Sequence, residues 1–434
     1  MLAWYKNSTA NPGGNEPVWD TGVMNGIGQL DCSKVDSSIR CEKKTPHTVT
    51  VVPGSTNRLR VVNAGTFAAF MFWIDGHNMT VIEVDGVNVQ PYTVSVMTLN
   101  VAQRYSILIN ANAPKGNYFI HANSYHMDPW ISLDPATLNQ SVKDFTPEVK
   151  GILNYKGVNP SDPPSSGHGQ PTKGMNLVDT NLKPIDAPHC PYQATNVQAF
   201  LFEFKFDSRD GDTYQKAYPV VRSLRNSTWN TLVNSSYVPP VHDPVLLGLH
   251  SKGSHYTSAR TTDNVIFIQT NQVIDIVIRN DDGGEHPFHI HGHNFWVMAV
   301  GVTNSLTHIP RTYTDSNPLL RDVVTVPACP HDDNGCLAAD ATHFDGYTGP
   351  LSSVTGGLPR GDIEDAWFGY AVIRFIADNP GAWIFHCHIA WHLAVGLSVT
   401  LVEGAERVPA LVQGVQVQQT CVDMQKYWNG EIEA

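Results

Sequence analysis

Two short histidine-rich segments hold the residues of this chain that are best suited to binding a transition metal. The first, residues 286–293, reads His-Pro-Phe-His-Ile-His-Gly-His, and the second, residues 386–388, reads His-Cys-His. Successive side chains of a β-strand point to opposite faces. If both segments are strands, His289 and His291 share a face, and Cys387 points away from its two histidine neighbours. One metal cannot easily bind all three residues of the second segment, which therefore predicts at least two metal sites.

The combination of one thiolate with two imidazoles is the ligand set of blue copper, and imidazoles alone, with open positions, suit copper that meets oxygen. The thiolate and its flanking histidines would then form a short covalent path for electrons between the two kinds of site. Zinc is the main alternative, because cysteine and histidine also build tetrahedral zinc sites. Neither segment contains the Cys-x-x-Cys spacing common in zinc sites. The pattern therefore favours copper over zinc, and a metal-free remnant of a copper protein is the remaining alternative.

Both segments, with the lead-in 377–383 (Ala-Asp-Asn-Pro-Gly-Ala-Trp), resemble the third and fourth copper signatures of multicopper oxidases, the family of laccases and ferroxidases. Residues 72–86 and 102–105 resemble the second domain of that family, so the resemblance covers essentially the whole chain. It implies an all-β protein of two cupredoxin-like, Greek-key sandwich or barrel domains with copper as cofactor. It also implies one-electron oxidation of phenolic donors at a blue copper, coupled to reduction of molecular oxygen to water at a trinuclear cluster.

The resemblance assigns a role to each ligand. It places three residues at the mononuclear blue site: His286, Cys387 and His392. It places His289 at the single copper of the trinuclear cluster. It places three residues at the coupled pair of coppers: His291, His386 and His388. Leu397 falls at the axial position of the blue site, where a leucine should favour a higher potential than methionine. We expect His293 to support the ligands without binding copper itself.

Multicopper oxidases resembling this chain have three cupredoxin domains, and the first supplies two further His-x-His pairs to the cluster. Outside the two segments this chain has no His-x-His pair, and residues 2–5 resemble the start of the second domain. We therefore expect the first domain to lie outside this chain, which leaves the cluster with half of its eight histidines. A partner chain or an upstream reading frame would have to supply the rest. Without them, a copper-binding electron-transfer module or an inert secreted glycoprotein is the alternative function.

Composition agrees with an all-β protein, because only 16% of the 434 residues are charged while 34 glycines and 29 prolines supply turns. Strand-like runs occur at residues 48–52, 58–62, 105–109 and 273–278. The Pro, Ser and Gly content of residues 157–174 predicts a linker. We predict domains at 1–156 and 185–434, joined by residues 157–184. The one helix expected follows Cys387, where a turn would return His392 to the copper that the thiolate binds.

The formal charge of −12 disfavours nucleic acid as a partner. The sequence contains no run of about 18 apolar residues, so it predicts no membrane span. The spacings of Cys32 with Cys41, and of Cys329 with Cys336, predict two local disulfides; Cys190 and Cys421 are left over. Glycosylation sequons begin at five asparagines: Asn7, Asn78, Asn139, Asn226 and Asn234. Together these features predict a secreted, extracellular glycoprotein.

The sequence indicates less clearly which electron donor, a phenol or Fe(II), the protein oxidises. Basidiomycete laccases carry an acidic residue in the phenol pocket, and the matching position here holds Phe67. Iron-oxidising relatives place carboxylates beside the blue site, and Glu16 and Asp282 match two of those positions, with Asp128 a looser third. Solvated loop carboxylates are the plainer interpretation, because residues 281–284 also form a turn signal. A phenol-oxidising laccase is the main prediction and Fe(II) oxidation the alternative; the polar C-terminal end favours a soluble secreted oxidase.

Overall fold

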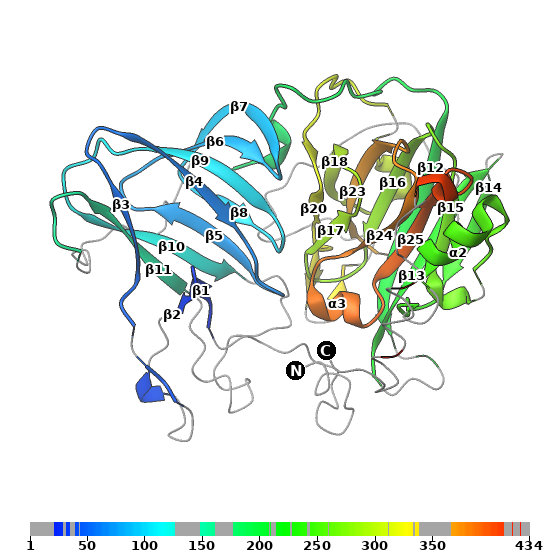
Figure 1. The fold of residues 1–434 in the computed structure, drawn as a ribbon, viewed down its shortest axis with the longest axis horizontal. Coiled ribbons are helices and arrows are strands. Elements are labelled where there is room, and N and C mark those ends of the chain that lie inside the picture. The colour runs from blue at the N-terminus through cyan, green and yellow to red at the C-terminus, as the bar shows by residue number, and fades with distance from the viewer. Residues whose placement is uncertain are drawn as a thin grey trace.

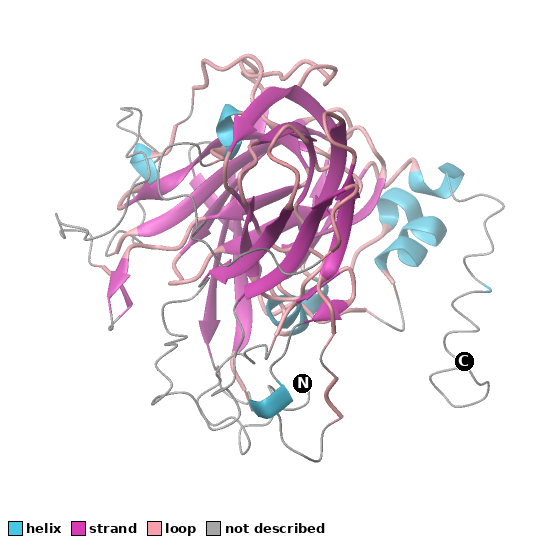
Figure 2. Ribbon diagram, turned by 90° about the vertical axis from the view of Figure 1, so that its left-hand side faces the viewer, coloured by secondary structure: helices cyan, strands magenta, loops and turns pink. Residues whose placement is uncertain are grey.

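The structure of the chain is a computed structural model. It describes residues 21–28, 32–34, 40–42, 44–125, 148–160, 177–207, 209, 214–225, 228–240, 244–258, 260–310, 312–332, 335–337, 366–411, 419 and 426. Strands far outnumber helices among these residues, so the predicted all-β fold class is confirmed. The strands form two β-sandwiches that lie side by side (Figure 1), and Figure 2 shows the same sheets from the side.

The N-terminal sandwich, on the left of Figure 1, consists of sheets with strand orders β3-β11-β10-β5-β8 and β4-β9-β6-β7. Alternate residues of β9, Tyr105, Ile107 and Ile109, are buried between the sheets, as the period of two requires. Asp85 and Gly86 both have positive φ and form the tight turn that joins β6 to β7. Its strands are β3 (His47–Val51), β4 (Thr56–Val62), β5 (Ala69–Ile74), β6 (Met79–Val84), β7 (Val87–Val94), β8 (Met97–Leu99), β9 (Arg104–Asn110), β10 (Asn117–Tyr125) and β11 (Glu148–Tyr155). They are preceded by β1 (Val23–Met24), β2 (Ile27–Gly28) and the 3₁₀ turn η1 (Cys32–Lys34).

The C-terminal sandwich pairs a seven-stranded sheet, β14-β13-β12-β16-β23-β18-β19, with a five-stranded sheet, β15-β25-β24-β17-β20. Its strands are β12 (Val197–Asp207), β13 (Lys216–Arg225), β14 (Thr228–Asn234), β15 (Val265–Ile268), β16 (Val273–Asn280), β17 (His286–Ile290), β18 (Phe295–Thr303), β19 (Leu320–Arg321), β20 (Val323–Val326), β23 (Phe368–Ile376), β24 (Gly381–Cys387) and β25 (Ser398–Glu403), with the small hairpin β21 (His331–Asp332) and β22 (Gly335–Cys336). The four strand runs predicted from the sequence fall within β3 and its flanking residue, β4, β9 and β16, and are confirmed.

An aromatic cluster in the C-terminal sandwich joins its two sheets. Phe202 of β12 meets Phe288 of β17 and Phe385 of β24 with ring centroids 5.3 Å apart in each case, close to edge to face. Phe288 and Phe385 also lie 5.3 Å apart. Such geometry is favourable beyond simple area burial. The cluster therefore fixes β17 and β24, which carry the two histidine-rich segments, against each other and against the opposite sheet.

Helices are few and short. The predicted helix after Cys387 is confirmed as α3 (Ala390–Ala394). The sequence did not predict α2 (Val245–Lys252) or α4 (Val408–Leu411), which pack on each other through Val245, Leu249 and Val408. The 3₁₀ turns are η3 (Asp179–Asn181), η4 (Gly253–His255), η5 (Thr261–Asp263) and η6 (Leu306–His308). No helix in the described part of the chain combines the length and apolar character that crossing a membrane requires.

Ion pairs join the two sandwiches. Arg104 of β9 binds both carboxylate oxygens of Asp322, at 2.6 and 2.9 Å. The fully buried Arg321 donates from Nε to Asp85, in the β6–β7 turn, at 2.9 Å. A more exposed ion pair joins Lys183 to Asp315 at 2.5 Å. Lys183 precedes Pro184, which pairs with Val89 of β7, and Asp315 belongs to the C-terminal sandwich. These contacts tie residues more than 130 positions apart in the sequence.

The predicted disulfides, Cys32–Cys41 and Cys329–Cys336, are both present and confirmed. Cys190 is buried and unpaired, whereas Cys421 lies outside the described residues. The linker prediction falls partly on residues 161–176, which also lie outside them. The proposed domain limits therefore stay a prediction.

Candidate metal centre

Strand pairing brings the two histidine-rich segments together. β17 and β24 run antiparallel with Phe288 opposite Cys387 and His289 opposite His386. Residues directly opposite each other in an antiparallel pair project to the same face. The two faces of this one strand pair therefore carry different chemistry, with Cys387 and His286 on one face and His289 with His386 on the other.

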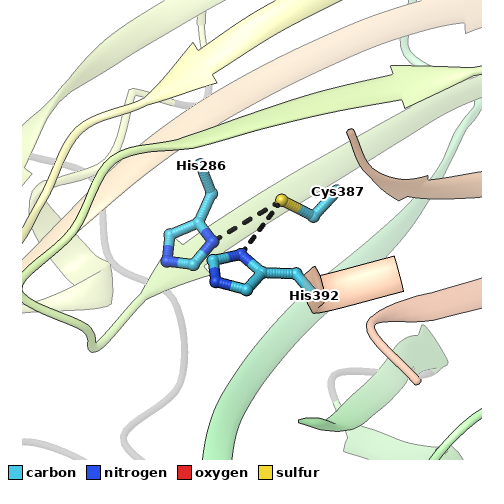
Figure 3. A group of neighbouring side chains, drawn as sticks. All are labelled: His286, Cys387 and His392. Carbon is cyan, nitrogen blue, oxygen red and sulfur yellow. Dashed lines mark hydrogen bonds between the residues drawn. The ribbon is translucent and has the colours of Figure 1, made fainter. Parts of the chain in front are cut away.

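On the first face, three side chains form what we call the thiolate group: His286, Cys387 and His392. The Cys387 sulfur lies 3.7 Å from Nδ1 of His286 and 3.4 Å from Nδ1 of His392 (Figure 3). The helix α3 follows the end of β24 and turns the chain back, so that His392 approaches the Cys387 sulfur. All three residues are buried. Within the described residues, this is the only group of three or more His, Cys, Asp or Glu side chains whose ligand atoms all lie within 4.8 Å of one another.

The contacts within and beside the thiolate group favour the ionised form of Cys387 and fix the orientation of His286. Burial, the largest influence on the Cys387 thiol, opposes ionisation, but His392 and His286 outweigh it and lower its pKa to about 7. Burial would lower the pKa of His286, yet Asp282 and the Cys387 sulfur raise it. Asp282 accepts a hydrogen bond from Nε2 of His286 at 3.0 Å. That bond keeps the proton on Nε2 and leaves Nδ1, the atom that faces the sulfur, free to bind a metal.

On the second face, four side chains form what we call the four-imidazole group: His289, His291, His386 and His388. Neighbouring ring centroids lie 4.9 to 5.7 Å apart, and Nε2 of His386 is 3.3 Å from Nε2 of His291. His386 donates from Nδ1 to the Cys387 carbonyl at 2.8 Å, which leaves Nε2 as its metal-binding atom.

Three imidazoles of this group, His291, His386 and His388, are kept neutral, as metal ligands must be. Burial is the main cause in each case, with the neighbouring imidazoles adding to it: the pKa of His386 falls to about 3, and those of His291 and His388 are lowered. A pocket of about 340 Å³ opens beside His289 and His388. Its other walls include residues 62–65, Arg104 and Asp322. Two members of the group, His289 and His388, are thus accessible from the pocket.

The remaining predicted residues lie as follows. The main chain of Leu397 bonds to both ends of the thiolate segment, accepting from Cys387 N at 3.2 Å and donating to His392 O at 2.9 Å, and its side chain is fully buried. His293 is apart from both groups and bonds to the buried carboxylate of Glu403 at 2.9 Å. The roles expected of Leu397 and His293 stay predictions.

Of the carboxylates predicted to bind iron, Asp282 contacts the thiolate group, whereas Glu16 and Asp128 lie outside the described residues. Phe67 lines a pocket of the N-terminal sandwich and is buried.

Sequence reasoning missed the phenylalanines that cover the thiolate group. The ring of Phe206 is stacked over His286 at 5.9 Å and lies 4.7 Å from His392, while Phe204 lies 4.7 Å from His286. The alternation Phe200, Phe202, Phe204 and Phe206 is a period-two signal that predicts one apolar face of a strand. It does not reveal that the end of this strand reaches the histidines.

Comparison with known proteins identifies the family. Sequence profiles described as multicopper oxidase match residues 2–157, and 238–334 with 366–407, more than half of the chain. The chain belongs to the multicopper oxidase family. The predicted family and its copper cofactor are thereby confirmed.

The relatives include both enzyme types considered above. The iron transport multicopper oxidase fio1 of Schizosaccharomyces pombe is 30% identical over 420 residues, covering 95% of this chain and 54% of the relative. A laccase of Phlebia radiata is 29% identical over 416 residues, covering 95% and 64%. This chain thus spans between about half and two thirds of the length of these relatives.

Solved structures confirm the cupredoxin architecture. The laccase of Botrytis aclada superposes with a TM-score of 0.69 at 25% identity, covering 98% of this chain and 65% of that one. Fet3p, a multicopper oxidase that functions in iron import, superposes with a TM-score of 0.64 at 24% identity, covering 99% and 67%.

Proposed function

We propose that this chain carries the electron-accepting half of a laccase-type multicopper oxidase, which takes single electrons from phenolic donors and delivers them toward oxygen. The observation that supports this most directly is the position of Cys387. Its sulfur belongs to the thiolate group, while its sequence neighbours, His386 and His388, belong to the four-imidazole group. Copper bound at the two groups, with the further histidines proposed below, would supply one-electron chemistry and the reduction of oxygen to water. The chain itself supplies a covalent path of one residue between them.

Residues around the thiolate group set its properties in three ways. Burial under Phe204 and Phe206 excludes water from the imidazoles. Asp282 fixes the tautomer of His286, and Leu397 offers no donor atom, which favours a high potential.

The four-imidazole group supports the proposal that further histidines come from outside the described residues. His289 and His388 line the pocket of about 340 Å³, so additional ligands can approach from that side without disturbing β17 or β24. We propose that a further histidine-bearing domain, on a partner chain or on more of the same polypeptide, occupies this position. The walls of the pocket at residues 62–65 and Arg104 would then contact that domain.

Fe(II) oxidation remains the second candidate function because of one contact. Asp282 bonds to His286 and keeps about a third of its side chain exposed, so it could bind a hard cation while touching a proposed copper ligand. Glu16 is proposed as a second iron ligand on the sequence alone.

A single-turnover experiment separates the two donors. The copper-loaded chain is mixed without oxygen with Fe(II) or with a phenol, and bleaching of the thiolate-to-copper band is followed. If iron is the donor, Asp282→Asn should slow bleaching by Fe(II) at least tenfold and leave bleaching by phenol nearly unchanged. Equal slowing with both donors would contradict a specific iron role.

Secretion and glycosylation are also proposals. Two disulfides favour an oxidising compartment, and the sequon asparagines Asn78 and Asn234 are exposed. Digestion of the natural protein with an endoglycosidase should lower its mass.

The central test is the copper content and visible spectrum of the purified chain. We expect about one tightly bound copper with an intense thiolate band. Cys387→Ser should abolish the band, His289→Ala should keep it, and Cys190→Ser is the matched control because that cysteine is also buried and unpaired. A Cys387→Ser protein that stayed blue would refute the assignment of the thiolate.

A further inference from the structure

The ring orientation of His289 is set by a main-chain atom. Nδ1 of His289 lies 2.7 Å from the carbonyl oxygen of Asp322. A carbonyl can only accept, so Nδ1 must carry a proton, and in the neutral ring Nε2 then keeps its lone pair. A partner of this kind fixes both the tautomer and the direction of a metal-binding imidazole.

The N-terminal sandwich holds the residue that provides this carbonyl. Arg104 reaches across the interface and donates from Nη1 and Nη2 to the two carboxylate oxygens of Asp322, at 2.6 and 2.9 Å. Its Nη1 also donates to the carbonyl of Ala102 at 3.1 Å. A two-point contact between planar groups fixes orientation as well as distance, which a lysine cannot do. The Asp322 side chain is therefore fixed in direction.

The residue before Asp322 is anchored to the same sandwich. Arg321 has no solvent exposure and pairs with Asp85 and Asp179. Asp85 in turn accepts from the main-chain N of Arg104 at 2.9 Å. Two consecutive residues of the C-terminal sandwich are thus bound to one point of the N-terminal sandwich, directly beside His289.

We propose that Arg104 is a positioning residue for His289: through Asp322, the N-terminal sandwich fixes the tautomer and ring direction of a metal ligand that belongs to the C-terminal sandwich. The inference rests on the proposed role of His289 as a copper ligand. The interface between the sandwiches would then help to orient a side chain of the four-imidazole group. We also expect the contact to act on this group and not on the thiolate group, which Arg104 does not touch.

The chain offers a matched control for this contact. Lys183, in the segment that hydrogen-bonds to β7, forms another ion pair with Asp315 of the C-terminal sandwich, and the side chains of Lys183 and Arg104 are both 34% exposed. Lys183→Met removes a cation from the interface without altering the surroundings of His289. Any general effect of weakening the interface should therefore appear in both Lys183→Met and Arg104→Met.

The first measurement uses metal-free protein labelled with ¹⁵N-histidine. Long-range ¹H–¹⁵N spectra, assigned with a His289→Gln variant, report which ring nitrogen carries the proton. In the unaltered protein and in Lys183→Met, we expect His289 to be protonated at Nδ1 alone. In Arg104→Met and in Asp322→Ala, we expect a mixture of tautomers. A pure Nδ1–H form in Arg104→Met would overturn the inference.

The second measurement is the affinity of the non-blue copper, read from its electron paramagnetic resonance signal in competition with a chelator. We expect Arg104→Met to weaken this copper by about 10- to 100-fold, the usual effect of losing an outer hydrogen-bonding partner, with the thiolate band unchanged. Arg104→Lys should recover only part of the loss. Because the effect passes through Asp322, the double variant Arg104→Met, Asp322→Ala should be no weaker than the worse single variant.

The outcomes separate this inference from the proposed function. Equal weakening of both copper signals, or equal effects of Arg104→Met and Lys183→Met, would show a merely structural role and overturn the inference. An unaltered protein that shows no thiolate band with copper would contradict the proposed function, and the tautomer of His289 would then still decide whether Arg104 positions the ring.

Discussion

Replacing Phe202 by alanine should destabilise the C-terminal sandwich severely and loosen the strands that carry the histidines. The ring is almost fully buried and contacts Phe288 and Phe385 at 5.3 Å each. Truncating a buried phenylalanine costs about 3–5 kcal/mol through lost transfer energy and the cavity left behind. The two edge-to-face contacts, at about 0.5–1.5 kcal/mol each, place Phe202 toward the upper end of that range. We therefore expect a loss of about 4–5 kcal/mol.

Urea unfolding of the copper-free chain, followed by near-ultraviolet circular dichroism, measures this loss. Phe267→Ala is the control, because that side chain is 47% exposed on β15 and its removal should cost less than about 1 kcal/mol. In the copper-loaded Phe202→Ala protein, the thiolate band should also disappear at a lower urea concentration than in the unaltered protein. A cost below about 1.5 kcal/mol for Phe202→Ala would refute the reasoning, since it would mean that the aromatic cluster does not hold the sheets together.

Two other perturbations have outcomes that the structure specifies. His121 bonds through both ring nitrogens to Asp75 and Glu148, and although burial opposes it, these carboxylates raise its pKa above 6.5. This stabilisation is complete below pH 6.5 and is lost as pH rises through the higher folded pKa, so urea midpoints should fall over that range and His121→Gln should flatten the fall. Arg374 binds both carboxylate oxygens of the buried Asp275, at 2.6 and 2.7 Å. Arg374→Met leaves that carboxylate without its partner and should lower the free energy of unfolding by about 3–5 kcal/mol. If the same urea assay found almost no change for Arg374→Met, Asp275 would have to find another partner or become protonated.

The division of the ligands between two faces was predictable from the sequence because it depends only on the alternation of residues along a strand. His386, Cys387 and His388 would be separated in this way in any β-strand. The return of His392 was predictable for a similar reason, since a short helix after Cys387 is the simplest way to bring a residue five positions later back to the sulfur. Local disulfides with short spacing were predictable as well.

Contacts between distant segments were not predictable. Arg104 and Asp322 are 218 positions apart, and although Arg104 lies in the segment 102–105 that resembles the family's second domain, nothing in the sequence marks the two residues as partners. The position of Phe206 over the histidines depends on how far β12 extends past β17, which only the packed sheets determine. The helix α2 was missed because its eight residues have no side-chain cap and follow a proline, so its stability comes from packing on α4.

The pairing register of β17 with β24 has a consequence for how this protein can change over evolution. A point substitution at a ligand damages one group, but a single inserted or deleted residue in β24 would shift its alternation by one and exchange its two faces. Cys387 would then face the imidazoles, and His386 would face the apolar core. Length variation should therefore be absent from these two paired strands and concentrated in the connecting segments, and homologous genes can be compared for that difference directly.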